Sequence, residues 1–184
     1  MKISKIFTFD ASHMLDGHDG KCQNLHGHTY QLEVTVASIL INEGAKAGMV
    51  MDFADLKTSV KQTILEPFDH AFLYHGNNER ESQIAALLEG WQMKTLRLNQ
   101  RTTAEHLAIE LYHRLQEFFF DFPLQSLLRG FARLDFAARK LPLAFIVAIT
   151  AGSGVDFAFC LHGVADHSGH NTNRFHNVLL LDSL

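Results

Sequence analysis

The stretch CQNLHGHTYQLEV, residues 22–34, decides the fold of this chain. From His26 onward, polar residues alternate with a second set of residues that is mostly apolar. A period of two is typical of a β-strand, in which successive side chains point to opposite faces of the sheet. One face of the predicted strand combines two histidines with apolar residues: His26, His28, Tyr30, Leu32, Val34 and Val36. Neutral imidazoles that point into a core need polar partners, so this histidine pair requires an explanation.

A shared metal ion is the explanation that the spacing favours. Side chains at positions i and i+2 of a strand have Cβ atoms roughly 6–7 Å apart, which suits two ligands of one ion. Residues 2–13 predict another strand of period two, with His13 at its end on the apolar face. If the two strands pair, His13 meets His26 and His28. Three histidines with an open fourth position are typical of catalytic zinc, so we expect Zn²⁺ at these residues.

Cys22 precedes the histidine pair in a glycine-containing loop over residues 14–24, and its spacing allows three roles. As a fourth ligand it would close the site and make the zinc structural. As a buried or solvated thiol it would be inert. As a thiolate stabilised by the nearby cation, it would take a proton from a bound substrate. The residues alone leave all three roles open.

Asp69 and His70 form a second candidate pair. A carboxylate beside an imidazole orients the ring for proton transfer. Alternatively, Asp69 caps a turn and His70 is solvated. Glu105 also has two interpretations: it closes a capping box with Thr102, or it binds a ligand.

The bulk composition excludes several classes of function. The chain has 184 residues, enough for one domain with a core, and a net charge of −4 without the basic stripe of a nucleic-acid-binding protein. Two cysteines make no disulfide framework and favour a reducing compartment. Residues 1–10 do not resemble a signal peptide, and the apolar run within residues 141–164 is too short to span a membrane. We expect a soluble, cytoplasmic protein with no membrane partner.

The order of elements predicts an α+β fold with an antiparallel sheet. After the two strands comes a helix with Asp52 as its N-cap, and a second helix covers about residues 79–90. Residues 68–82 show no regular pattern up to that helix. The capping box at residues 102–105 opens a third helix, and residues 141–164 predict two buried strands joined by a Gly-Ser-Gly turn. The chain contains no internal repeat, so we expect one domain over residues 1–184.

Five motifs occur in the order FDASHML, KCQNLHGHTYQLEV, GMVMDFADLK, FDHAFL and TTAEHLA. Together they resemble the family of 6-pyruvoyl-tetrahydropterin and 6-carboxy-tetrahydropterin synthases, and the resemblance covers about residues 1–115. It implies the tunnelling fold, or T-fold, in which each subunit contributes a four-stranded antiparallel sheet with two helices on one face. It also implies homo-oligomers: trimers that form a barrel and stack into hexamers, with active sites between subunits.

The resemblance also implies roles for six residues. His13, His26 and His28 match the zinc ligands of the family, and Cys22 matches its catalytic base. Asp69 and His70 match a proton-transfer pair that reaches in from a neighbouring subunit.

The implied substrate is a small molecule, 7,8-dihydroneopterin triphosphate. We expect a zinc-dependent lyase of the queuosine pathway that forms 6-carboxy-tetrahydropterin and releases acetaldehyde and triphosphate. Two alternatives remain: 6-pyruvoyl-tetrahydropterin synthesis, or a zinc- and pterin-binding homologue that has lost catalysis.

The sequence departs from the family pattern at its C-terminal end. Members of the family usually carry a late glutamate that anchors the pterin, whereas this chain has no glutamate after Glu117, and about residues 127–184 are divergent. Asp135 is the nearest candidate for the anchor. With Thr103 and Glu105 it completes our set of candidate substrate-binding residues. Thr102 stands where a proline is common in the family.

Overall fold

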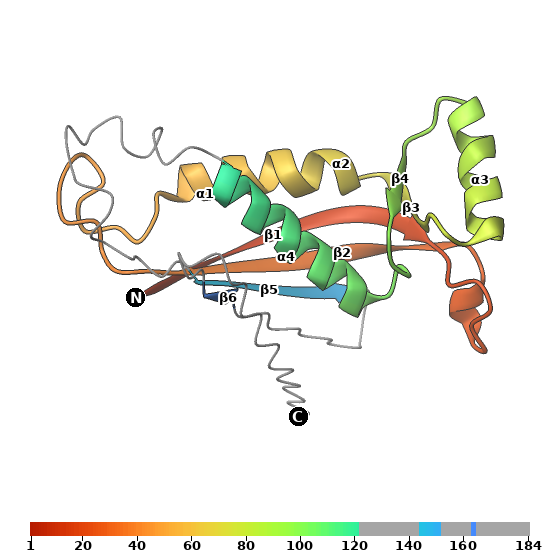
Figure 1. Ribbon diagram of the computed structural model, residues 1–184, viewed down its shortest axis with the longest axis horizontal. Helices are drawn as coiled ribbons and strands as arrows, with labels where there is room; N and C mark the ends of the chain where they lie inside the picture. Colours follow the sequence, from red (N-terminus) through yellow and green to blue (C-terminus); the bar gives the residue numbers. More distant parts are fainter. Residues whose placement is uncertain (122–143, 152–162, 165–184) are drawn as a thin grey trace.

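The computed structural model describes residues 1–121, 144–151 and 163–164 of the chain (Figure 1). The strands of this part are β1 Lys2–His13, β2 His26–Ala37, β3 Ala71–His75, β4 Thr95–Leu98, β5 Ala144–Ala151 and β6 Gly163–Val164. Its α-helices are α1 Phe53–Val60, α2 Glu66–Phe68, α3 Glu79–Gly90 and α4 Ala104–Asp121. A π-helical segment, Lys61–Leu65, joins α1 to α2, and a short 3₁₀ turn, Lys21–Gln23, lies between β1 and β2.

The strands form one mixed sheet in the order β4-β3-β1-β2-β5-β6. The long strands β1 and β2 pair antiparallel, with His13 opposite His26, and β5 pairs antiparallel with β2. The expected α+β T-fold is confirmed. The prediction of a purely antiparallel, four-stranded sheet was wrong in detail, because β3 runs parallel to β1 and β4 runs parallel to β3. The described part of the sheet has six strands.

The path of the chain explains these parallel pairs. The helical run from α1 to α2 ends beside the last part of β1, and the chain then enters the sheet with Ala71 paired to Ala11. β3 therefore continues in the direction of β1. The prediction that residues 68–82 are irregular was wrong, since Ala71–His75 is a strand. With five residues, this strand is too short to show a clear periodic pattern.

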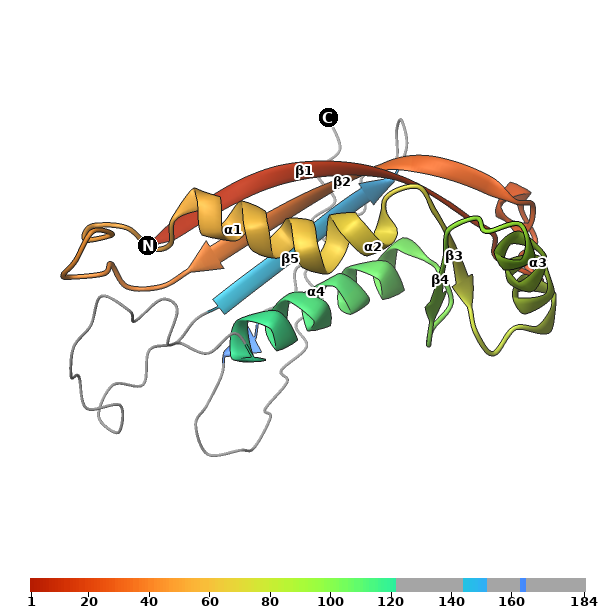
Figure 2. The same ribbon diagram turned by 90° about the horizontal axis from the view of Figure 1, so that it is seen from above.

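The helices α1, α2 and α4 cover one face of the sheet, and α3 lies at the end near β3 and β4 (Figures 1 and 2). Residues at spacing four along α4 are buried, as expected for a helix with one apolar face: Leu107, Leu111 and Leu115. They pack in one core cluster with Leu32 and Val34 of β2. This core fixes which side of β1 and β2 faces the helices.

The predicted helix starts are confirmed in one case and wrong in another. Asp52 caps α1, its carboxylate accepting a hydrogen bond from the amide of Ala54 at 2.8 Å. The expected helix over residues 79–90 is α3. The capping box of Thr102 and Glu105 is not formed. Instead α4 begins one residue later, and the hydroxyl of Thr103 accepts a hydrogen bond from the His106 amide at 3.4 Å.

The C-terminal predictions are only partly covered by the described residues. One strand of the expected pair in residues 141–164 is β5, whereas the Gly-Ser-Gly turn lies outside the described residues. Asp135 also lies outside them. None of the described helices combines the length and the apolar character that crossing a membrane requires.

Candidate functional site

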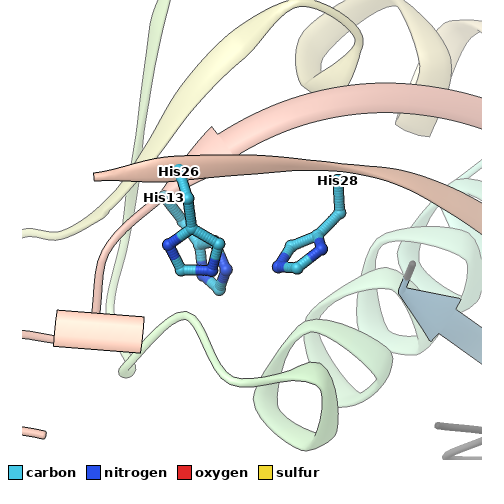
Figure 3. Close-up of side chains that lie close together, drawn as sticks. All are labelled: His13, His26 and His28. Atoms are coloured by element: carbon cyan, nitrogen blue, oxygen red, sulfur yellow. The ribbon is translucent and has the colours of Figure 1, made fainter. Parts of the chain in front are cut away.

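Three histidines from β1 and β2 come together on the face of the sheet that the helices cover. A ligand nitrogen of each one of His13, His26 and His28 lies within 4.8 Å of the others. The ring centroid of His13 lies 4.6 Å from that of His26 and 5.2 Å from that of His28. The ring centroids of His26 and His28 are 4.8 Å apart. Figure 3 shows the three rings projecting from the strands into one space. This grouping is the one that the period of two predicts.

Gly27 allows the two strands to approach closely at this point. It lies between the two histidines of β2 and opposite Ser12 of β1. A Cβ atom on Gly27 would lie 3.3 Å from the carbonyl oxygen of Ala11, closer than most side chains come to a neighbouring backbone. A side chain at this position would press on the backbone of β1 next to the residues that place His13 opposite His26.

Hydrogen bonds orient two of the rings so that their Nε2 atoms are free to bind a metal. The Nδ1 atom of His13 lies 2.8 Å from the carbonyl oxygen of Thr102, and Nδ1 of His26 lies 2.7 Å from that of Asn24. A carbonyl only accepts, so both Nδ1 atoms carry the proton and both Nε2 atoms keep a lone pair. His13 Nε2 is buried without a hydrogen-bond partner within the described structure.

Electrostatics keep His13 neutral at physiological pH. Burial, and then the neighbouring His26 and His28, lower the pKa of His13 from 6.5 to about 4. Burial, followed by the charge of His26, also lowers the pKa of His28. A neutral imidazole is the form that binds a metal. Three imidazoles grouped in this way, with the Nε2 atom of His13 unpaired, fit a divalent cation such as Zn²⁺ and leave a position for another ligand.

Cys22 lies near these histidines in the chain but is not part of their cluster. It is half-buried in the 3₁₀ turn, and its carbonyl oxygen accepts a hydrogen bond from the Leu15 amide at 2.8 Å. Among the described residues, the group of mutually close metal-ligating atoms has three members and does not include the Cys22 sulfur. This arrangement disfavours the role of Cys22 as a fourth ligand.

A polar network fastens the loop that carries Cys22. The carboxylate of Asp16 accepts hydrogen bonds from Arg80 at 2.9 Å and Asn78 at 3.2 Å, and its carbonyl oxygen accepts one from Arg101 at 2.8 Å. Glu81, only 1% exposed, accepts a bond from the His75 amide at 2.7 Å. The loop is therefore tied to the first turn of α3 and its N-cap on one side, and to the segment before α4 on the other.

The second predicted pair lies beside the opposite face of β1. Along β1, His13 and Ala11 are buried, whereas Asp10 is exposed. Asp69 and His70 group with Asp10, and ligand atoms of all three lie within 4.8 Å of one another. The Nδ1 atom of His70 is 2.9 Å from an Asp69 oxygen, so the carboxylate orients the ring. The pair and the cluster of three histidines therefore lie on different sides of β1.

Backbone contacts hold the Asp69–His70 turn in an uncommon conformation. His70 has a φ of 60°, in the left-handed region that few residues other than glycine adopt. The His70 amide donates to the Asp10 carbonyl at 2.6 Å, and the Asp10 amide donates to the Asp69 carboxylate at 3.0 Å. That amide is the main reason that the pKa of Asp69 is lowered. The ammonium of Lys94 donates to the carbonyl oxygens of Glu66 and Asp69.

The model of the 6-pyruvoyl tetrahydropterin synthase family matches residues 2–126. This chain belongs to that family. A 6-carboxy-5,6,7,8-tetrahydropterin synthase from Haemophilus influenzae is 58% identical over 115 residues, which cover 62% of this chain and 82% of the relative. The synthase of the same name from Rickettsia felis is 36% identical over 115 residues, which cover 62% of this chain and 80% of that relative.

Solved structures, among them a 6-pyruvoyl tetrahydropterin synthase, share the fold. The enzyme from Plasmodium vivax matches with a TM-score of 0.55 at 14% identity, covering 85% of this chain and 96% of its own. An uncharacterised protein from Wolinella succinogenes matches with a TM-score of 0.52 at 17% identity, covering 83% of this chain and 98% of its own. At this identity the likeness concerns the fold.

The remaining candidate residues of this family member lie at the start of α4. Thr103 caps the helix and Glu105 is half-buried in its first turn, both shortly after Thr102, which contacts His13. Sequence reasoning missed Thr102, Asp10 and Lys94 as parts of the sites. Only the departure of Thr102 from the family pattern gave a signal, and it did not indicate what the residue contacts.

Proposed function

We propose that this chain is a zinc-dependent lyase that converts 7,8-dihydroneopterin triphosphate and one molecule of water to 6-carboxy-tetrahydropterin, acetaldehyde and triphosphate. The observation that carries the proposal is the cluster of His13, His26 and His28 with its unpaired buried nitrogen. It occurs in a chain 58% identical, over 115 residues, to a protein named for that product. The three histidines would hold zinc. When bound, the ion would act as a Lewis acid toward the hydroxyl groups of the substrate side chain.

The protein residues would move the protons. Cys22, as a thiolate in its fastened loop, would take a proton from a carbon of the substrate side chain. His70, oriented by Asp69 at 2.9 Å, would transfer a second proton while triphosphate leaves. Thr103, Glu105 and Asp135 are the proposed contacts to the substrate. We also propose that residues 1–184 form a single domain.

The positions of these groups favour an active site shared between subunits. Cys22 lies in the loop after the strand end that bears His13, whereas His70 groups with the exposed carboxylate of Asp10. Among the described residues, the group that contains Asp69 and His70 does not include the Cys22 sulfur, and it lies on the other side of β1 from the histidine cluster. We propose a homo-oligomer, a trimer or hexamer, in which Asp69 and His70 of one subunit complete the site of its neighbour.

Metal content and product analysis test the reaction. Purified wild type is expected to contain about one zinc per chain and to release both acetaldehyde and triphosphate from the substrate. Triphosphate release without acetaldehyde would support the pyruvoyl-forming alternative. Zinc without any turnover would support the non-catalytic homologue, which the absence of glutamate after Glu117 favours. A protein without bound metal would contradict the proposal.

Mixing two inactive variants tests the shared site. Cys22→Ala and His70→Ala are each expected to be inactive when assembled alone. After joint dissociation and reassembly at equal amounts, about a quarter of the sites would combine an intact Cys22 with an intact His70. Recovery of about a quarter of wild-type activity is therefore expected. If the mixture stays as inactive as its parts, the site is not shared in this way.

A further inference from the structure

Thr102 is the most deeply buried polar residue beside the histidine cluster, with no exposed surface. Its carbonyl oxygen lies 2.8 Å from His13 Nδ1 and its hydroxyl oxygen lies 3.2 Å from the same atom. One imidazole N–H therefore meets two acceptors of a single residue. This arrangement fixes both the tautomer of His13 and the angle of its ring.

The hydroxyl group of Thr102 has a second contact. It donates a hydrogen bond to the carbonyl oxygen of Met14 at 3.2 Å. Met14 directly follows His13, and the next amide, that of Leu15, donates to the carbonyl oxygen of Cys22. A continuous path of bonds therefore leads from His13 through Thr102 and the start of the loop to Cys22.

The geometry points to Thr102 as a positioning residue that fixes, through one side-chain hydroxyl, both the metal-ligating ring of His13 and the loop that carries Cys22. The role of the metal rests on the proposed function, but the path of contacts does not. A hydrogen-bond partner of the ring nitrogen that does not bind the metal orients the histidine and raises the metal affinity. Losing such a partner typically weakens metal binding by about 10–100-fold. Here the carbonyl of residue 102 remains in every variant, so the effect of the hydroxyl lies near the lower limit.

The variants isolate the hydroxyl. Thr102→Val keeps the shape of the side chain and removes its polar group, whereas Thr102→Ser keeps the hydroxyl. Thr35→Val is the matched control, because Thr35 is also buried, at 9% exposure, and its hydroxyl is bonded to that of Ser4 at 2.7 Å. Thr35 lies on β2, where it pairs with Ser4 of β1, away from the histidine end of the two strands.

The first measurement is the zinc affinity of the assembled protein, by competition with a chelator in the absence of substrate. Thr102→Val is expected to bind zinc about tenfold more weakly than wild type. The zinc affinities of Thr102→Ser and Thr35→Val are expected to stay within about twofold of wild type, since neither variant loses a hydrogen-bond partner of His13. An unchanged affinity of Thr102→Val, or an equal loss in Thr35→Val, would overturn the proposal.

The second measurement is the rate at which iodoacetamide alkylates Cys22 in the metal-free protein, with Cys160→Ser in every chain. Thr102→Val is expected to react about threefold faster than wild type, the change that one lost neutral hydrogen bond produces in a local opening equilibrium. Thr102→Ser and Thr35→Val are expected to react at the wild-type rate. An unchanged rate in Thr102→Val would overturn the link to the loop. Both measurements are made without turnover, so a failure of the proposed reaction would leave their result readable.

Discussion

Two histidine-containing groups flank the same strand, and they differ in how complete they are. The cluster of His13, His26 and His28 lies on the buried face, where it is oriented by carbonyl groups of the same chain. The Asp69–His70 pair lies beside the exposed face: the His70 side chain is 74% exposed and that of Asp69 is 42% exposed. The histidine cluster brings three possible metal ligands together within one chain, whereas the exposed pair is a single oriented imidazole largely open to solvent.

The two groups have different structural requirements. A metal site needs several ligands at fixed distances, and antiparallel pairing of two long strands supplies them within the monomer. A proton-transfer pair needs only one well-oriented imidazole, so it can be contributed by another subunit. The left-handed backbone of His70 and its contacts to Asp10 keep the pair oriented while it remains exposed.

Removing one metal ligand should have the largest effect. His28→Ala leaves two imidazoles, so we expect zinc to be lost from the purified protein, with an affinity decrease beyond the roughly 100-fold that an outer hydrogen-bond partner contributes. Turnover should fall to background. His113→Ala, on α4, is the matched control and should retain zinc and activity. Full metal content in His28→Ala would show that the histidine cluster is not the metal site.

Changing the exposed pair should separate turnover from metal binding. In His70→Ala and Asp69→Asn we expect turnover to fall by about 10²–10⁴, the usual contribution of a general acid or base. The zinc content should match wild type in both variants, because neither residue lies in the buried cluster. Elemental analysis and steady-state kinetics on the same preparations check this. Loss of zinc in either variant would show that the two groups form one metal site.

The lowered pKa of His13 predicts acid sensitivity of the metal-free protein. Its pKa is about 4 in the folded state and about 6.5 in the unfolded state, so below pH 6.5 protons bind preferentially to the unfolded chain. The contribution of neutral His13 to the unfolding free energy is fully present above pH 6.5 and is lost as the pH falls toward 4. We expect His13 to account for a decrease of about 2 kcal/mol in unfolding free energy between pH 7 and pH 5.

Denaturant titrations of the metal-free wild type and of metal-free His13→Asn measure this contribution. The asparagine amide can donate to the same carbonyl of Thr102 but does not titrate in this range. The decrease in stability from pH 7 to pH 5 should therefore be smaller in the variant. Equal decreases in the two proteins would show that His13 does not resist protonation in the folded state.

Lys94 should have the smallest effect. Its ammonium holds the carbonyl oxygens of Glu66 and Asp69, just before the strained residue His70. We expect Lys94→Met to lower kcat by about tenfold with KM unchanged, less than the roughly 100-fold that a 1 Å misplacement can cost. Lys94→Arg, which can still donate to a carbonyl, should recover most of the activity. A change in KM alone would show that Lys94 contacts substrate instead of orienting the pair.

The buried cluster could be predicted from the sequence because the period of two decides which side chains share a face. His26 and His28 needed only this local rule, and His13 needed in addition the pairing of neighbouring strands. Thr102 could not be predicted, since it contacts His13 from 89 positions away and partly through its main chain. The capping box at Thr102 was misassigned for the same reason: its hydroxyl is used by His13 and Met14.

The separation of the two groups by β1 was also beyond sequence reasoning within one chain. Asp69 and His70 stand in a short turn, and their side of the sheet depends on where β3 joins β1. That register rests on the pairing of Ala71 and Phe72 with Ala11 and Ser12, which no local pattern specifies. The resemblance to a family implied a shared site, whereas the residues themselves predicted only that the two form a pair.

Anomalous diffraction at the zinc absorption edge, from crystals of the zinc-loaded oligomer, would locate the metal. We expect one strong peak per chain, about 2.0–2.1 Å from nitrogens of His13, His26 and His28, with Cys22 not bound to it. We also expect His70 of a neighbouring subunit to face this peak. A peak bound by Asp10, Asp69 and His70, or a zinc ion with the Cys22 sulfur as its fourth ligand, would show that the proposed metal site is wrong.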